Sequence, residues 1–177
     1  PDGPMGDQKI WNHSWVGSFG STNYDHDALR RLDWVVERDD VLVTVGLNNG
    51  TQQQPLLSYG YNSISVGRRD GDHSWGDVPA PYEGAGRMKP DITGPLFTTS
   101  EATPTIAAAA AMFVEMVRND PVLPDEGETS ETLKAVLMTS ATHTGPSGSG
   151  LNWTNNAPES GPDRGLTARP LDELVGA

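Results

Sequence analysis

The chain has 177 residues, a formal net charge of -12 at pH 7, a sequence pI near 4.5 and no cysteine. This length suits one domain with a sizeable core, and the acidity leaves no basic stripe for a nucleic acid. The absence of cysteine excludes disulfides, thiolate metal sites and a thiol nucleophile. The longest apolar run is about half of what a bilayer-spanning helix needs, so we expect no membrane segment.

A strand, a helix and a second strand are predicted in the first part of the chain. Residues 9–17 alternate weakly and end in glycine, which is typical of a short strand. Residues 25–38 carry apolar side chains on one helical face, and residues 41–45 are a β-branched run typical of a strand covered on both faces. The economical interpretation is a βαβ crossover in a parallel sheet.

Asn48 follows this second strand, at the carboxyl edge of the predicted sheet, where the active groups of open α/β sheets collect. Its amide is a candidate donor for an oxyanion, but Asn-Asn-Gly is equally an ordinary turn sequence. Farther along we expect another short buried strand at 61–67, a polar surface loop at 68–86 and an extended segment at 88–95.

Ser100 is the strongest candidate functional residue. It precedes Pro104 and an unbroken apolar run at 106–114, a pattern that predicts a central helix buried on every side. Free backbone N–H groups and the positive dipole end at such an N-terminus favour a developing negative charge, as a nucleophilic serine requires. The alternative is a serine that only caps the helix.

The rest of the chain predicts one further helix. Residues 129–132 form a capping pattern, and residues 133–141 place apolar side chains on one face. Residues 143–169 are polar and show no period, and residues 170–177 begin another element.

Six segments, in this order along nearly the whole chain, resemble motifs of the subtilisin-like serine peptidases (subtilases). Residues 12–15 resemble the substrate-binding strand N-x-S-[WL]-G, residues 43–50 resemble VVAAGNxG, and residues 99–104 match GTSxAxP apart from its glycine. The other three are YNxIxVG at 61–67, xKPDI at 88–92 and LKAxLxxSA at 133–141. The resemblance implies a three-layer α/β/α subtilisin-like fold, with a mostly parallel sheet and a central helix after the nucleophile.

The resemblance also implies a serine endopeptidase that acts on peptide or protein substrates. Ser100 would be the nucleophile, and Asn48 and the Ser100 backbone N–H would be the oxyanion donors. Four further positions would border the substrate cleft: Ser14, Trp15, Gly46 and Leu47. Subtilases often bind Ca²⁺, and by family habit we expect a bacterial protein of the extracellular space or cell envelope.

The chain departs from the family in its catalytic set. The D-[TS]-G and H-G-T-H motifs, which carry the family's Asp and His, occur nowhere in it. We therefore expect residues 1–177 to be a partial catalytic domain, cut upstream of the substrate-binding strand and at its C-terminal end. Alone it should be inactive, because a serine without a base is a poor nucleophile. His13 is a candidate substitute base.

Three smaller departures keep a second hypothesis open, a non-catalytic subtilase-like domain for peptide binding or scaffolding. Thr98 and Leu47 replace glycines of the motifs, so that Leu47 should intrude on the cleft, and Glu101 places a carboxylate directly after the serine.

Polar clusters at 25–27 and 70–73 suggest a Ca²⁺ or Zn²⁺ site, although polar loops form such clusters freely. Half of a doubly wound sheet also leaves a strand edge uncovered, so we expect an oligomer or a covering upstream segment.

Overall fold

A four-stranded parallel sheet forms the centre of the computed structural model, which describes residues 7–84, 86–143, 171 and 175–177. Its strands are β1 (Ile10–His13), β2 (Leu42–Gly46), β3 (Ile64–Arg68) and β6 (Ile92–Gly94), in the order β1-β2-β3-β6. The protein therefore has an α/β fold, as predicted. Most of the element expected at 170–177, and the polar stretch after residue 143, lie outside the described residues.

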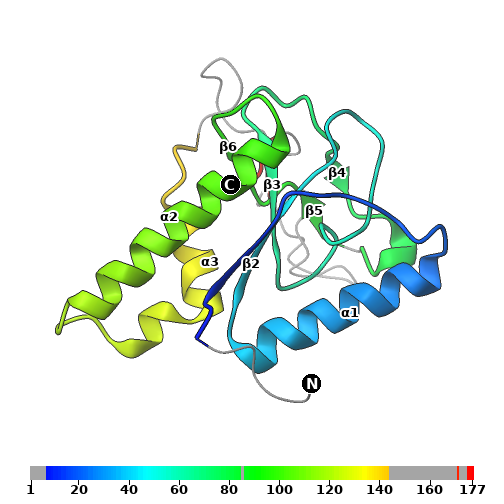
Figure 1. Cartoon of the computed structure of the whole chain (residues 1–177). Helices are drawn as coiled ribbons and strands as arrows, with labels where there is room; N and C mark the ends of the chain where they lie inside the picture. Colours follow the sequence, from blue (N-terminus) through cyan, green and yellow to red (C-terminus); the bar gives the residue numbers. More distant parts are fainter. Residues whose placement is uncertain (1–6, 85, 144–170, 172–174) are drawn as a thin grey trace, which may run out of the picture.

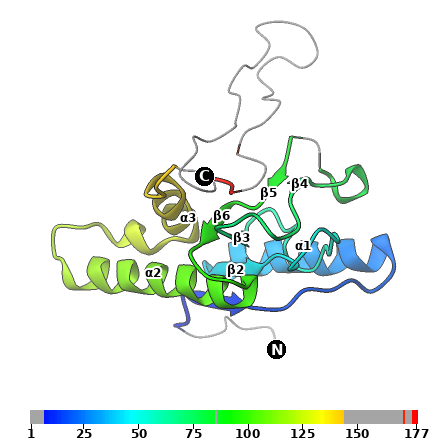
Figure 2. The same ribbon diagram turned by 90° about the horizontal axis from the view of Figure 1, so that it is seen from above.

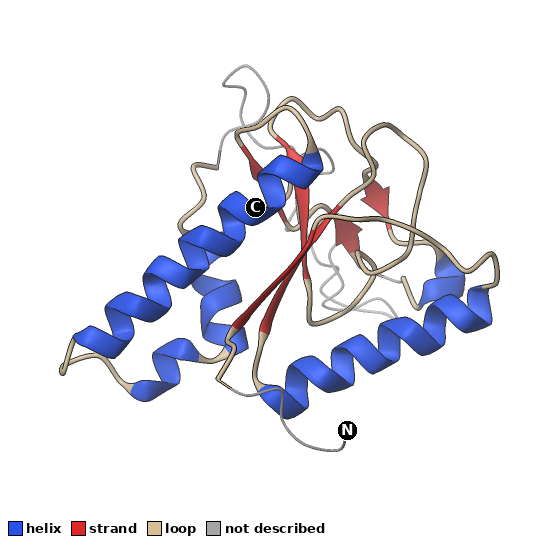
Figure 3. Cartoon of the chain, in the orientation of Figure 1, coloured by secondary structure: helices blue, strands red, loops and turns tan. Residues whose placement is uncertain are grey.

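In the described part of the chain, three α-helices accompany the sheet. α1 (Thr22–Asp39) connects β1 to β2 and completes the predicted βαβ unit, whereas α2 (Thr99–Asn119) and α3 (Ser130–Thr139) follow β6. In Figure 1, α1 and α2 lie on either side of β1 and β2, and the same division is visible in Figure 3. Within the described ranges, no helix has the length and apolarity needed to cross a membrane.

Two apolar layers hold the helices on opposite faces of the sheet, because successive residues of a strand point to opposite sides. Leu42 of β2 belongs to a core with Ile106 of α2 and Leu137 of α3. Its neighbour Val43 belongs to a second core with Val36 of α1. Figure 2 shows the result from above, with α2 and α3 on the left, α1 on the right and the sheet between them.

The prediction that the helix after Ser100 is buried on every side is wrong. One face of α2 packs on the sheet, and the opposite face is exposed over a row of apolar residues, with Met112 76% exposed. The exposed apolar residues are Ala108, Ala109, Ala111, Met112 and Met116. Alanine suits both environments, so an alanine-rich run does not reveal which of its sides packs.

The exposed face of α2 and the edge strand β1 are the surfaces on which the predicted oligomer contact or covering partner would pack. We expect the chain to sediment as an oligomer, and Met112→Glu to shift it toward the monomer because a carboxylate resists burial. Val122→Glu, at a residue that is 86% exposed beyond the helix, is the control. Sedimentation velocity measures both, and a wild-type chain that remains monomeric at high concentration would refute the expectation.

The polar segment at 68–86 is more ordered than predicted. It contains β4 (Gly76–Asp77), which pairs antiparallel with β5 (Met88–Lys89), and the short helix η1 (Ala80–Tyr82). His73 is buried there, and its Nδ1 accepts a hydrogen bond from the Arg68 backbone N–H at 3.0 Å. Polar composition predicts exposure, but local backbone hydrogen bonds allow polar side chains to be buried.

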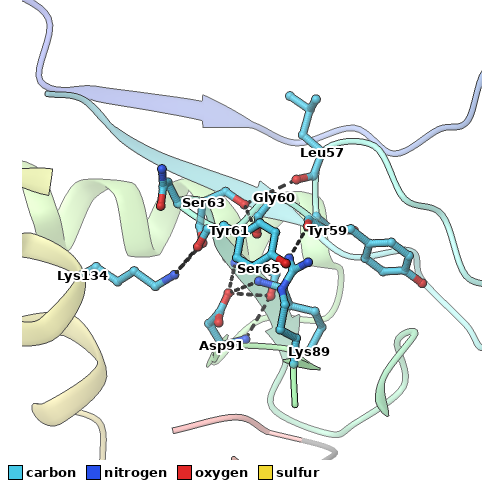
Figure 4. A network of polar contacts seen from close by, with 12 residues as sticks. Leu57, Tyr59, Gly60, Tyr61, Ser63, Ser65, Lys89, Asp91 and Lys134 are labelled. Atoms are coloured by element: carbon cyan, nitrogen blue, oxygen red, sulfur yellow. Dashed lines mark hydrogen bonds and ion pairs between the residues drawn. The ribbon is translucent and has the colours of Figure 1, made fainter. Parts of the chain in front are cut away.

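A buried ion pair between Lys89 and Asp91 lies at the connection from β5 to β6, and Asp91 links this connection to β3. Asp91 Oδ2 accepts hydrogen bonds from Lys89 Nζ at 2.7 Å, from the Ser65 N–H at 2.7 Å and from Ser65 Oγ at 2.9 Å (Figure 4). From α3, Lys134 Nζ donates to the Ser63 carbonyl oxygen at 2.9 Å. These contacts fix the start of β3 against both β6 and α3.

The Lys89–Asp91 ion pair should make the free energy of unfolding depend on pH in the acidic range. Burial raises the pKa of Asp91, but the positive charges of Lys89 and Lys134 and the hydrogen bonds outweigh it, so the pKa lies below its ordinary value. A carboxyl whose pKa is lower in the folded than in the unfolded state stabilises the fold above about pH 4. That contribution is lost as the pH falls through the folded-state pKa.

We therefore expect the free energy of unfolding of the wild type to fall more steeply between pH 5 and pH 2 than that of Lys89→Met/Asp91→Leu. Urea unfolding followed by tryptophan fluorescence at several pH values measures both slopes. Other carboxylates contribute equally to the two proteins, so the difference between the slopes isolates the pair. Identical slopes would show that Asp91 is not the acid-sensitive group.

Candidate active site

The carboxyl end of β2 meets the amino end of α2. Gly46 closes β2 and lies so near the helix that an added Cβ would stand 3.0 Å from Thr103 Oγ1. One residue farther on, the Leu47 carbonyl oxygen accepts a hydrogen bond from Thr99 Oγ1 at 2.5 Å. The Thr99 N–H donates to Asn49 Oδ1 at 2.9 Å. The first turn of α2 is thereby fixed against the end of the strand.

Thr98, and not Ser100, is the N-cap of α2. Its side chain accepts a hydrogen bond from the Glu101 N–H at 3.2 Å, and its hydroxyl donates to the Glu101 carboxylate at 2.9 Å. The Thr-x-x-Glu spacing is that of a capping box, and it places the cap two residues before Ser100. The alternative of Ser100 as a mere cap is therefore wrong, and the Glu101 carboxylate is held by Thr98.

Ser100 lies exposed in this first turn. Its Oγ donates to the carbonyl oxygen of Ser14 at 3.1 Å. Ser14 directly follows β1, the edge strand, so the structure brings the predicted nucleophile to the predicted substrate strand. The hydroxyl also lies at the positive end of a 21-residue helix.

The side chains of three other predicted site residues, Asn48, Leu47 and Trp15, are hydrogen-bonded to groups other than Ser100 or buried. Asn48 follows Leu47, but its Nδ2 donates to the Gln52 carbonyl oxygen at 3.0 Å, so the amide here serves the turn. The Leu47 side chain is only 1% exposed and lies in the interior instead of intruding on a cleft. Trp15 is 48% exposed, and its indole N–H donates to His13 Nδ1 at 3.2 Å.

A base for Ser100 is absent from the contacts of the described residues. All of the chain's histidines are described, namely His13, His26, His73 and His143. His13 is nearest to Ser14 in sequence, yet its Nδ1 accepts from Trp15, and burial lowers its pKa. The hydroxyl of Ser100 itself bonds to a backbone carbonyl, which cannot take its proton.

The polar clusters that suggested a metal have protein partners. Asp70 and Asp72 form ion pairs with Arg68 at 2.5 and 3.0 Å. Asp25 is buried and accepts a hydrogen bond from Ser18 Oγ at 2.7 Å. In the part of the chain that the structure describes, no three His, Asp or Glu residues are grouped to hold a metal ion.

The sequence matches no family model and no curated protein. The likeness to subtilases therefore rests on the six motifs. Three of them, those at 12–15, 43–50 and 99–104, meet around Ser100 through the hydrogen bonds above.

Proposed function

We propose that this chain forms the nucleophile-bearing part of a subtilisin-like serine peptidase and that Ser100 attacks the scissile carbonyl. The observation that carries the proposal is the position of Ser100, exposed in the first turn of α2 with its Oγ 3.1 Å from a carbonyl oxygen beside the edge strand. Attack on a peptide carbonyl creates an oxyanion, which the Ser100 backbone N–H and the helix dipole would stabilise.

The edge strand β1 offers a way to hold the substrate. Among the described strands β1 pairs with β2 alone, so an extended peptide can add to its other side by backbone hydrogen bonds. Ser14 and Trp15 continue β1 toward Ser100. A peptide bound along this edge would bring a carbonyl carbon near the nucleophile, where it would displace the Ser14 contact of the hydroxyl.

Catalysis requires two changes from the arrangement described. The Asn48 amide must leave the Gln52 carbonyl oxygen to reach an oxyanion. A base must also take the proton of Ser100, and we assign this base and its orienting carboxylate to polypeptide outside these 177 residues. Without it, this chain hydrolyses peptides slowly or not at all.

The second candidate function is peptide binding without chemistry. One observation favours it: both polar groups expected to act are already engaged, Ser100 with Ser14 and Asn48 with Gln52. A groove beside an edge strand binds peptides whether or not a nucleophile is activated.

Hydrolysis and binding assays separate the two functions. They require the protein extended by the polypeptide that precedes this chain, with Ser100→Ala and, as a matched control, Ser140→Ala at the exposed end of α3. A peptidase cleaves casein, loses cleavage in Ser100→Ala and keeps it in Ser140→Ala. Peptide binding by the folded wild type without any cleavage would overturn the peptidase proposal in favour of the binding domain.

A further inference from the structure

A cavity of about 320 Å³ lies at the opposite edge of the sheet from Ser100. Its lining includes Arg87, Lys89 and Asp91 around the β5–β6 connection, and Lys134 of α3. These residues surround the amino ends of β3 and β6, whereas Ser100 stands at the carboxyl end of β2. The cavity is thus separate from the candidate active site.

The charge of this lining is unusual for the protein. In a chain with a net charge of -12, the cavity gathers three basic residues against one carboxylate. The lysines of the chain are Lys9, Lys89 and Lys134, and two of these three line it. A formal excess of two positive charges results.

Hydrogen bonds satisfy the basic groups without neutralising them. Lys134 Nζ donates to the carbonyl oxygens of Ser63 at 2.9 Å and Tyr61 at 3.3 Å (Figure 4). Arg87 donates to the carbonyl oxygen of Tyr82 at 3.1 Å, and its guanidinium lies 3.7 Å from the centroid of the Tyr61 ring. Neither forms an ion pair with a carboxylate among the described residues, and Asp91, the carboxylate of the cavity, pairs with Lys89.

The three basic groups also influence one another. Burial lowers the pKa of Lys89, attraction to Asp91 opposes this shift, and repulsion from Lys134 and Arg87 lowers the pKa further. Repulsion of this kind means that the positive charges share one poorly screened region. An anion in the cavity would relieve it.

We propose that this cavity binds a dianionic phosphate group, with Lys134 as its principal ligand. Two negative charges match the excess of two positive charges, and an ammonium with three donors, two of them bound to carbonyls, keeps one for a phosphate oxygen. The cavity also exceeds the size of a bare phosphate, and Met138 and Leu171 give it an apolar wall. A small phosphate monoester therefore fits better than inorganic phosphate.

Isothermal titration calorimetry on the 177-residue chain at pH 8 tests the proposal. The probes are inorganic phosphate and glycerol phosphate, and chloride at equal ionic strength is the control anion. We expect saturable binding with one site, weakened about tenfold or more by Lys134→Met, which removes one charged hydrogen bond. Lys134→Arg keeps the charge and should keep most of the affinity. Arg31→Gln, which removes a charge from the exposed side of α1, should change nothing. Circular dichroism establishes that each variant is folded.

The comparison of probes identifies the source of the phosphate: tighter binding of glycerol phosphate supports an organic monoester, and tighter binding of inorganic phosphate supports the free ion. Absence of saturable binding, or equal affinity in Lys134→Met, would overturn the site. Binding that occurs only after Asp172→Asn and Glu173→Gln would also overturn it, because carboxylates next to Leu171 would then be the counter-ions. None of these outcomes depends on peptidase activity.

Discussion

Asp91→Asn is expected to lower the free energy of unfolding by about 3–5 kcal/mol, the usual cost of removing one partner of a buried ion pair. The substitution leaves the ammonium of Lys89, whose side chain is 6% exposed, without its counter-ion. It also weakens the acceptor for the N–H and hydroxyl of Ser65. A loss of this size is a large share of the stability of a domain of this length.

Two variants serve as controls for this prediction. Lys89→Met/Asp91→Leu removes both charges, and it should be clearly more stable than Asp91→Asn because no charge is left buried alone. Glu83→Gln removes one partner of the exposed Arg30–Glu83 pair and should have little effect, since solvent screens that pair. Urea unfolding measures all three. Equal losses for Asp91→Asn and Glu83→Gln would mean that the Lys89–Asp91 pair contributes nothing special.

Asn48→Ala is expected to lower kcat by about 10²–10³-fold in the extended protein that contains the base, because one oxyanion donor is lost. The donor acts on charge that develops only in the transition state, so KM should change little. Steady-state kinetics on a fluorogenic peptide measures both constants. The expectation includes a local movement, since the amide must first leave the Gln52 carbonyl oxygen.

Asn119→Ala, an exposed asparagine at the far end of α2, is the matched control and should leave both constants unchanged. A rise in KM for Asn48→Ala with kcat unchanged would assign Asn48 to the turn alone. In that case the oxyanion would have to rely on backbone donors at the start of α2.

The regular elements were predictable because their patterns are local. The sequence correctly predicts three elements, with ends displaced by a few residues. They are α1 from its apolar face, β2 from its β-branched run and α3 from its capped start. The parallel pairing of β1 and β2 followed from the order strand, helix, strand.

The surroundings of the candidate site were less predictable, because they depend on contacts across the sequence. Nothing local indicates that Asn49 would hold the Thr99 N–H, or that Asn48 would turn toward Gln52. The Thr98–Glu101 cap, in contrast, has the local spacing of a capping box, so the position of the N-cap is predictable from sequence. The sequence also does not indicate which face of α2 is exposed, because alanine occurs on both its buried and its exposed sides.

The central claim is that Ser100 is a nucleophile, and covalent labelling with a fluorophosphonate probe tests it most directly. The extended protein, labelled and digested, is analysed by mass spectrometry, with Ser100→Ala and Ser140→Ala in parallel. We predict one labelled peptide that contains Ser100, lost in Ser100→Ala and retained in Ser140→Ala. A folded extended protein that takes up no label, or takes it up at another serine, would contradict the claim.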